Sequence, residues 1–172
     1  MKTFSIALVI ALFALSGCSK ESEQSLWKKV EASRAGNNSD STIQVCRQII
    51  ADYPSGKFAP GALYMIAETY YRGKHDPRTA TGYYRDFIAK YPDLVQTPVA
   101  MFLIGFIYNN DLGNPDSAKI GYEQFLQKYP NHELAKSAQF ELENLGKTAD
   151  EILKDKQPSA KAGGRSEGVR RK

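Results

Sequence analysis

Three Tyr-Pro dipeptides divide much of this 172-residue chain into units of equal length. They lie at residues 53–54, 91–92 and 129–130, so the period is 38 residues. A period of this length indicates a solenoid, because one supersecondary unit cannot bury its apolar face alone and stacks on copies of itself. The positions that recur in three units are Ala62, Ala100 and Ala138; Tyr64, Phe102 and Phe140; Cys46, Tyr84 and Tyr122; and Ile49, Phe87 and Phe125.

Each unit is expected to contain two helices. Asn38, Asp76 and Asn114 occupy the same position in successive units, and proline follows the last two. An Asn or Asp cap with proline at the first helical position is a strong signal for a helix start. Apolar residues spaced three and four apart follow, and the proline of each Tyr-Pro ends the second helix. The predicted helices cover 24–34, 40–52, 60–72, 77–90, 98–110, 115–128 and 134–145.

The units resemble the tetratricopeptide repeat over about residues 24–147. In that family the first helix carries, in this order, a bulky residue, then Leu, then Gly or Ala, and then Tyr. The second helix carries Ala, then an aromatic residue, and is followed by Pro. The resemblance implies an all-α tetratricopeptide-repeat solenoid of three helix pairs plus a C-terminal capping helix. Glu141, Glu143 and Asn144 replace apolar or small residues of earlier units, as the solvated outer face of a terminal repeat requires. The matching residues are Leu63, Ile66, Ala67 and Tyr70; Met101, Ile104, Gly105 and Tyr108; Ala80, Tyr84 and Pro92; and Ala118, Tyr122 and Pro130.

Residues 1–17 have the pattern of a secretory signal peptide. The apolar run over 4–15 is about 18 Å long as a helix, too short for a bilayer core of about 30 Å. The tetrapeptide Leu-Ser-Gly-Cys that ends at Cys18 resembles the bacterial lipoprotein signal, whose cysteine is acylated, with palmitate for example, and becomes the new N-terminus. An ordinary signal peptide with a chance cysteine is the alternative. Ser19 resembles the second residue of lipoproteins sent to the outer membrane.

The basic character of the chain belongs to its C-terminal end. From Lys154 onward there are seven Lys and Arg against two acidic residues, whereas 18–153 carries 15 basic and 17 acidic residues. The folded part therefore offers no basic footprint, and no nucleic-acid partner is expected. We expect 18–23 to be an acylated tether and 148–172 to be a basic, mostly disordered tail. The tail either contacts anionic lipid or an acidic partner, or is solvated without a role.

The sequence contains no motif that indicates catalysis or a cofactor. It lacks a phosphate loop, a dinucleotide-binding fingerprint, a zinc-binding helix motif and a cysteine pair. His75 and His132 lie at predicted turns and are expected to be solvated or capping residues, and Cys46 is expected to be a small buried apolar residue. We therefore expect no enzymatic activity, no cofactor and no metal site. An envelope enzyme without a recognisable motif is a distant alternative.

Binding of other proteins is the predicted role. In tetratricopeptide proteins the first helix of each unit lines the concave face, so the resemblance implies a groove there. Tyr64, Phe102 and Phe140 would form an aromatic column suited to apolar anchors of extended or helical segments. The alternative is that these rings pack within the solenoid. The predicted partner-binding residues are Tyr64, Glu68, Tyr71, Phe102, Phe106, Asn109, Phe140 and Asn144.

The leader and the repeats together predict a lipid-anchored adaptor on the periplasmic side of the bacterial outer membrane, bound to protein or peptide segments of the cell envelope. Two families resemble this combination. The lipoprotein component of the β-barrel assembly machinery is anchored in this way but usually has about five repeats. The Tol-Pal-associated periplasmic repeat protein is closer in repeat count but is normally not acylated and begins with a coiled coil. An accessory of outer-membrane protein assembly is the first hypothesis and a Tol-Pal or peptidoglycan-synthesis adaptor the second; the oligomeric state is left open.

Overall fold

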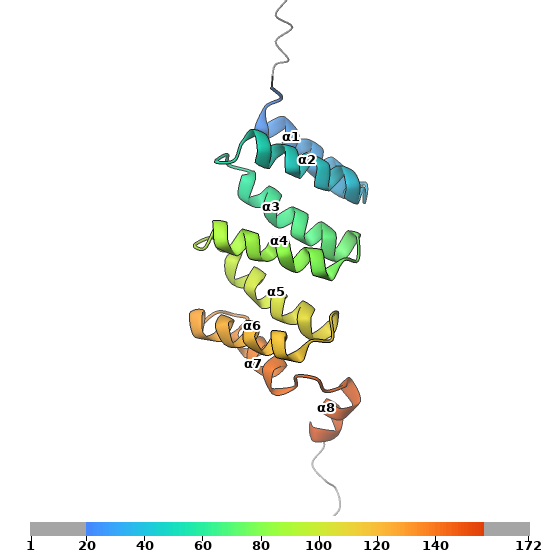
Figure 1. The fold of residues 1–172 in the computed structure, drawn as a ribbon, viewed down its shortest axis with the longest axis vertical. Helices are drawn as coiled ribbons and strands as arrows, with labels where there is room; N and C mark the ends of the chain where they lie inside the picture. Colours follow the sequence, from blue (N-terminus) through green and yellow to red (C-terminus); the bar gives the residue numbers. More distant parts are fainter. Residues whose placement is uncertain (1–19, 157–172) are drawn as a thin grey trace, which may run out of the picture.

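The described residues, 20–156, form an elongated stack of helices in the computed structural model (Figure 1). This part of the chain has eight α-helices, one short π-helical segment and no strand. The predicted signal peptide, Cys18 and the chain beyond residue 156 lie outside the described residues. The elements are α1 (Glu23–Ala35), α2 (Ser39–Asp52), α3 (Ala59–Glu68), η1 (Thr69–Gly73), α4 (Pro77–Lys90), α5 (Thr97–Asn110), α6 (Pro115–Lys128), α7 (Ala135–Glu143) and α8 (Ala149–Lys156).

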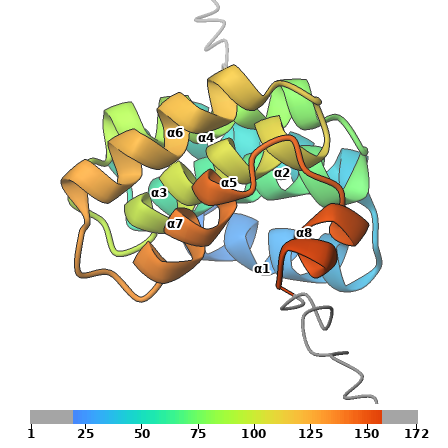
Figure 2. The ribbon, with the colours of Figure 1, turned by 90° about the horizontal axis from the view of Figure 1, so that it is seen from below.

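The stack is built from consecutive helix pairs. Each helix from α2 to α6 contacts the helix before it and the helix after it in the chain, so the pairs α1–α2, α3–α4 and α5–α6 follow one another along the long axis (Figure 1). Figure 2 shows α4 and α6 on one side of the stack, with α5, α7 and α1 on the other. We call these sides the second-helix face and the first-helix face. The all-α solenoid of three helix pairs and a capping helix is confirmed.

The second helix of each pair begins at the predicted cap. The side chains of Asn38, Asp76 and Asn114 each accept a hydrogen bond from the backbone N–H three residues later, at 3.0 Å in all three. These bonds satisfy N–H groups that have no partner inside the helix. The repeat in the sequence is therefore a repeat of helix starts.

The residue before each cap repeats in conformation although not in type. Asn37, His75 and Gly113 are 38 residues apart and have φ values of 52°, 53° and 57°. This left-handed conformation is costly for most residues with a side chain and free for glycine. The turn between the two helices of a pair thus has the same backbone conformation in all three units, although the residue there is Asn, His or Gly.

The second and third helix pairs each have a buried tyrosine in the core. Tyr84 and Tyr122, one period apart, are fully buried, and within the described residues neither hydroxyl has a hydrogen-bond partner. Burial raises the pKa of both hydroxyls, so they stay protonated. Their rings fill the core while their hydroxyls lack hydrogen-bond partners. This desolvation penalty would be absent with a phenylalanine.

Replacing Tyr84 by phenylalanine should therefore stabilise the domain. An unsatisfied buried hydroxyl carries a desolvation penalty of about 1–3 kcal/mol, partly offset here by the small void left behind, so we expect a gain of about 1 kcal/mol. Urea denaturation followed by circular dichroism measures the change. A loss of stability in Tyr84→Phe would show that the hydroxyl has a partner after all, such as a bound water.

The C-terminal end closes the stack with α7 and continues beyond it. Ala138 of α7 is buried in a core cluster with Tyr122 of α6, and Glu143 is exposed, as expected for a solvated cap. Glu141 instead turns toward α5, where its carboxylate accepts a hydrogen bond from Asn109 at 3.4 Å. Residues 149–156, which the sequence placed in a mostly disordered tail, form α8.

Candidate interaction site

A hollow on the first-helix face lies where one unit meets the next. Its volume is about 650 Å³. Aromatic side chains of α5 border it on one side and the end of the preceding first helix on the other. The lining residues are Tyr71, Arg72 and His75 from the earlier unit and Phe102, Leu103, Phe106 and Asp111 from the later one.

Two rings of α5 form an apolar side of this pocket. Phe102 and Phe106 lie four residues apart on one face of the helix, and their ring centroids are 6.4 Å apart. Phe102 also packs on the rings of Tyr122 and Phe125, at 5.7 and 6.0 Å, which fixes it to the core. Phe106 belongs to none of the three core clusters of the described residues. It is therefore the ring that a partner could cover.

A hydrogen bond joins the two units across the pocket. The hydroxyl of Tyr71 donates to Oδ2 of Asp111 at 2.9 Å. Burial, followed by this bond and the charge of Asp111, raises the pKa of Tyr71 to about 12, so the hydroxyl remains a donor at neutral pH. Arg72 and His75, both exposed, complete a polar rim. The pocket combines apolar rings with polar groups at its edge, as protein-binding surfaces do.

Glu68 lines a different, more polar pocket of about 360 Å³ beside the α1–α2 turn. Arg34 of the last turn of α1 and Asn38, the cap of α2, also line it, and Arg72 lines this pocket as well as the larger one. The two hollows therefore adjoin at Arg72. Together they extend along the first-helix face from the first unit to α5.

Tyr64 is part of the core and lines neither hollow. Its half-buried ring meets Tyr84 and Phe87 edge-on, at centroid distances of 5.5 and 5.2 Å. Burial is the main cause of the raised pKa of its hydroxyl. The sequence left open whether these rings pack within the solenoid, and for Tyr64 the contacts are those of packing.

The remaining predicted site residues lie near the C-terminal end of the stack. Asn109 donates to Glu141 and so links α5 to α7. The amide of Asn144 donates to the carbonyl oxygen of Phe140 at 2.7 Å, and the ring of Phe140 is 39 % exposed. None of the three lines the large pocket. The structure thus brings together Tyr71, Phe102 and Phe106 at the large pocket.

The profile of the tetratricopeptide repeat family matches residues 61–94 and 99–132. These segments contain most of α3–α4 and α5–α6, the two pairs that meet at the large pocket. The protein is an all-α tetratricopeptide-repeat solenoid. The sequence matches no curated protein. Solenoids of this kind present extended surfaces to other proteins, so the tetratricopeptide repeats indicate a protein-binding scaffold.

Sequence reasoning missed four residues around the large pocket of this tetratricopeptide solenoid: Arg72, His75, Leu103 and Asp111. Three of them lie at or beyond the ends of first helices, where the chain leaves the regular α-helix. The π-helical turn η1 widens the end of the helix, with the N–H of Lys74 bonded to the carbonyl oxygen of Thr69 at 2.9 Å. Repeat position predicts which face a helical residue is on, but it does not predict how such a turn points its side chains.

Within 20–156 no three His, Cys, Asp or Glu side chains are placed to hold a metal ion. Cys46 is fully buried, and burial raises its pKa to about 12, so it is a thiol and not a nucleophilic thiolate. The helices of this range are also too short or too polar to cross a membrane.

Proposed function

We propose that this protein is a lipid-anchored adaptor of the bacterial envelope that holds an apolar-anchored segment of a partner protein on its first-helix face. Its place is the periplasmic side of the outer membrane, as an accessory of outer-membrane protein assembly. The observation that carries the binding role is the 650 Å³ pocket where Phe106 is bordered by the polar side chains Arg72 and Asp111. Aromatic side chains in such a setting are frequent hot spots of binding.

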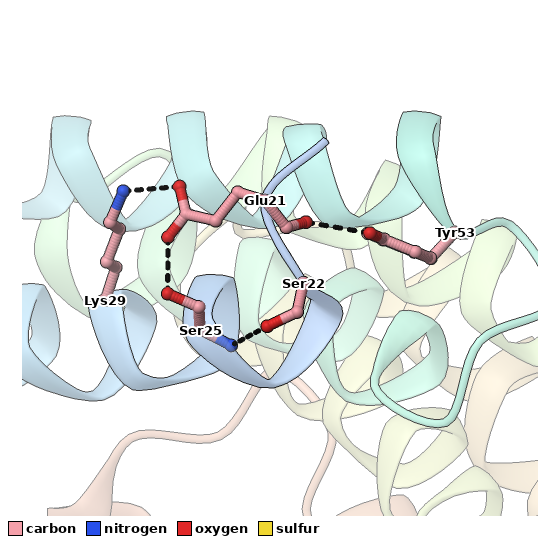
Figure 3. A network of polar contacts seen from close by, with 5 residues as sticks. All are labelled: Glu21, Ser22, Ser25, Lys29 and Tyr53. Atoms are coloured by element: carbon pink, nitrogen blue, oxygen red, sulfur yellow. Dashed lines mark hydrogen bonds and ion pairs between the residues drawn. The ribbon is translucent and has the colours of Figure 1, made fainter. Parts of the chain in front are cut away.

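The segment before α1 supports a short tether between anchor and domain. In Figure 3 the hydroxyl of Tyr53, at the end of α2, donates to the carbonyl oxygen of Glu21 at 2.7 Å. The carboxylate of Glu21 accepts from Ser25 at 2.6 Å and pairs with Lys29 at 2.5 Å. Glu21 is thereby attached to both helices of the first pair, and a lipid on Cys18 would be three residues, about 10 Å at most, from this point.

The binding proposal is tested by photo-cross-linking in intact cells. A photoreactive phenylalanine replaces Arg72, which is exposed and lines both hollows, and in a matched variant it replaces Gln44, which is exposed on α2 and lines neither hollow. We expect a discrete cross-linked partner from position 72 and none from position 44. No product from position 72, or the same products from both, would contradict binding on the first-helix face.

The anchor is tested by changing Cys18 to serine. The mutant should lose lipid labelling and leave the membrane fraction, because it would lack the several acyl chains that hold a lipoprotein firmly on the bilayer. Even one acyl chain would bind the bilayer only marginally. Mass spectrometry of the wild-type N-terminus gives the direct measurement. Wild-type protein without an acyl group, recovered in the soluble periplasmic fraction, would remove the envelope-anchor part of the proposal.

One observation favours the second candidate, a Tol-Pal or peptidoglycan-synthesis adaptor. The described residues contain three helix pairs and a capping helix, which is closer to the repeat count of that group than to the five repeats usual in the assembly lipoprotein. The identity of the protein cross-linked to position 72 separates the two. An outer-membrane barrel-assembly protein supports the first candidate, and a Tol-Pal or cell-wall-synthesis protein supports the second.

A further inference from the structure

A further pocket lies on the second-helix face, bordered by α4, α5 and α6. Its volume is about 410 Å³, and a cavity of about 150 Å³ is enough to hold a benzene ring. Its lining is mostly apolar, with Arg85 as its one charged residue. We call it the ring pocket, and the residues that matter below are Arg85, Ile88, Ile104, Tyr108, Ile120 and Gly121.

The same positions one period earlier surround a tyrosine of the protein itself. There the ring of Tyr83 is stacked on Tyr70, with centroids 5.4 Å apart and planes at 9°, and Arg47 donates to its hydroxyl at 3.1 Å. Tyr83, Tyr70 and Ile50 all pack against the core cluster that contains Ile66. The equivalent residues, 38 apart, are Arg47 and Arg85, Ile50 and Ile88, Ile66 and Ile104, and Tyr70 and Tyr108.

In the later unit the position of Tyr83 is occupied by Gly121. A Cβ at Gly121 would lie 3.1 Å from the Cα of Gly105, so the close approach of α6 to α5 favours glycine there. The neighbouring Ile120 does not replace the ring, because its side chain is 56 % exposed. The space that Tyr83 fills in the earlier unit is therefore open in the later one.

The groups around this space suit a phenol. Arg47 donates from Nη2 to two phenols, those of Tyr70 and Tyr83, whereas within the described residues Arg85 donates to one, Tyr108, at 2.6 Å. A guanidinium has five N–H donors, so Arg85 can serve a second acceptor. Its charge favours an electron-rich ring with a hydroxyl and disfavours a Lys or Arg side chain. Tyr108 offers the face on which such a ring stacks.

From this internal template we infer that the ring pocket receives a tyrosine side chain of a partner protein, in the place that Tyr83 occupies one unit earlier. The partner's ring stacks on Tyr108, its hydroxyl accepts from Arg85, and its flanking residues cover the exposed Ile120. The surface lies on the opposite side of the stack from the large pocket, so it does not depend on the proposed function.

The test uses the full chain carrying Cys18→Ser, which removes the proposed acylation site and the need for detergent, with ¹³C-labelled isoleucine methyl groups. The probes are p-cresol, toluene and the capped tripeptide Gly-Tyr-Gly. A bound ring should shift the methyl signals of Ile88 and Ile104 in a saturable way and leave those of Ile50 and Ile66 unchanged. Because Arg85 bonds only the phenol, p-cresol should bind about tenfold more tightly than toluene, and the tripeptide should produce the same shifts.

Matched variants assign the effect to its cause. Arg85→Ala should weaken p-cresol binding about tenfold and leave toluene binding unchanged, whereas Arg47→Ala, the same change one unit earlier, should alter neither. Tyr83→Gly should open the equivalent space, so that p-cresol now also shifts Ile50 and Ile66. If Tyr83→Gly does not fold, the two arginine variants still show whether Arg85 recognises the phenol.

Three results would overturn the inference. Absent or unspecific shifts of Ile88 and Ile104 would show that the pocket takes no ring. Toluene binding as tightly as p-cresol would exclude the tyrosine hydroxyl as the recognised group. Binding of p-cresol without binding of the tripeptide would show a site for free phenols and not for a protein segment. All three leave cross-linking from the first-helix face unaffected.

Discussion

Replacing Gly105 by leucine should cost the domain about 3 kcal/mol or more of its free energy of unfolding. A Cβ at this position would lie 2.9 Å from two ring atoms of Tyr122, and that ring is fully buried between α5 and α6. It packs on Phe102 and cannot move aside without opening the core. Overpacking of this kind costs about 1–3 kcal/mol for smaller insertions, and leucine adds four carbons at a contact already at its limit.

Gly82→Ala is the control for Gly105→Leu. Gly82 lies in α4, and a Cβ there would meet nothing within 4 Å. Alanine in an open helical position should stabilise by about 0.5–1 kcal/mol, since glycine loses more backbone freedom on folding. Urea denaturation of the wild type and the two variants, followed by circular dichroism at 222 nm, gives the sign of each change in the free energy of unfolding. If Gly105→Leu and Gly82→Ala change stability in the same direction, the contact between α5 and α6 is looser than the structure shows.

Truncating Ile107 and Phe106, adjacent residues of α5, should have opposite consequences. Ile107 is completely buried, so Ile107→Ala should cost about 2–5 kcal/mol of stability. Phe106 is half-buried, lines the large pocket and lies outside the core clusters of the described residues. Phe106→Ala should therefore leave the melting temperature nearly unchanged while it removes a binding hot spot of about 2 kcal/mol, roughly 30-fold in affinity.

Two measurements separate these effects. Thermal unfolding ranks the variants by stability, and the yield of cross-linked partner from a photoreactive residue at position 72 ranks them by binding. We expect a large fall in yield for Phe106→Ala at a temperature where the variant is folded. A fall in melting temperature as large as that of Ile107→Ala would show that Phe106 is a core residue, and the binding assignment would then fail.

The fold was predictable because its signals are local and repeated. Asp76-Pro77 and Asn114-Pro115 mark helix starts by a mechanism that acts within one turn, and the structure shows those caps bonded. The apolar spacing of Tyr84, Phe87 and their counterparts then fixes which face is buried. The helix α8 was not predicted, although Thr148 and Glu151 have the spacing of a capping box and are hydrogen-bonded in that way at its start.

The candidate site was predicted only in part, because the same repeat position can serve packing or binding. Tyr64 and Phe102 are equivalent in sequence and both meet two aromatic rings of the following helix, yet of the two only Phe102 lines the large pocket. The difference arises from the turns around them, where His75 and Asp111 contribute pocket walls. No residue of the sequence indicates the ring pocket, because the pocket is the space left open where Gly121 has no side chain.

The neighbour-by-neighbour packing of α1 to α7 also sets how quickly the chain can fold. Even its far-reaching contacts are short in sequence: Tyr71 reaches Asp111 over 40 residues and Arg47 reaches Tyr83 over 36. Helical proteins with such low contact order fold in microseconds to milliseconds, because little loop entropy is lost before contacts form. The pair α1–α2 can thus close without the rest of the chain, and each later pair then finds a folded surface on which to nucleate.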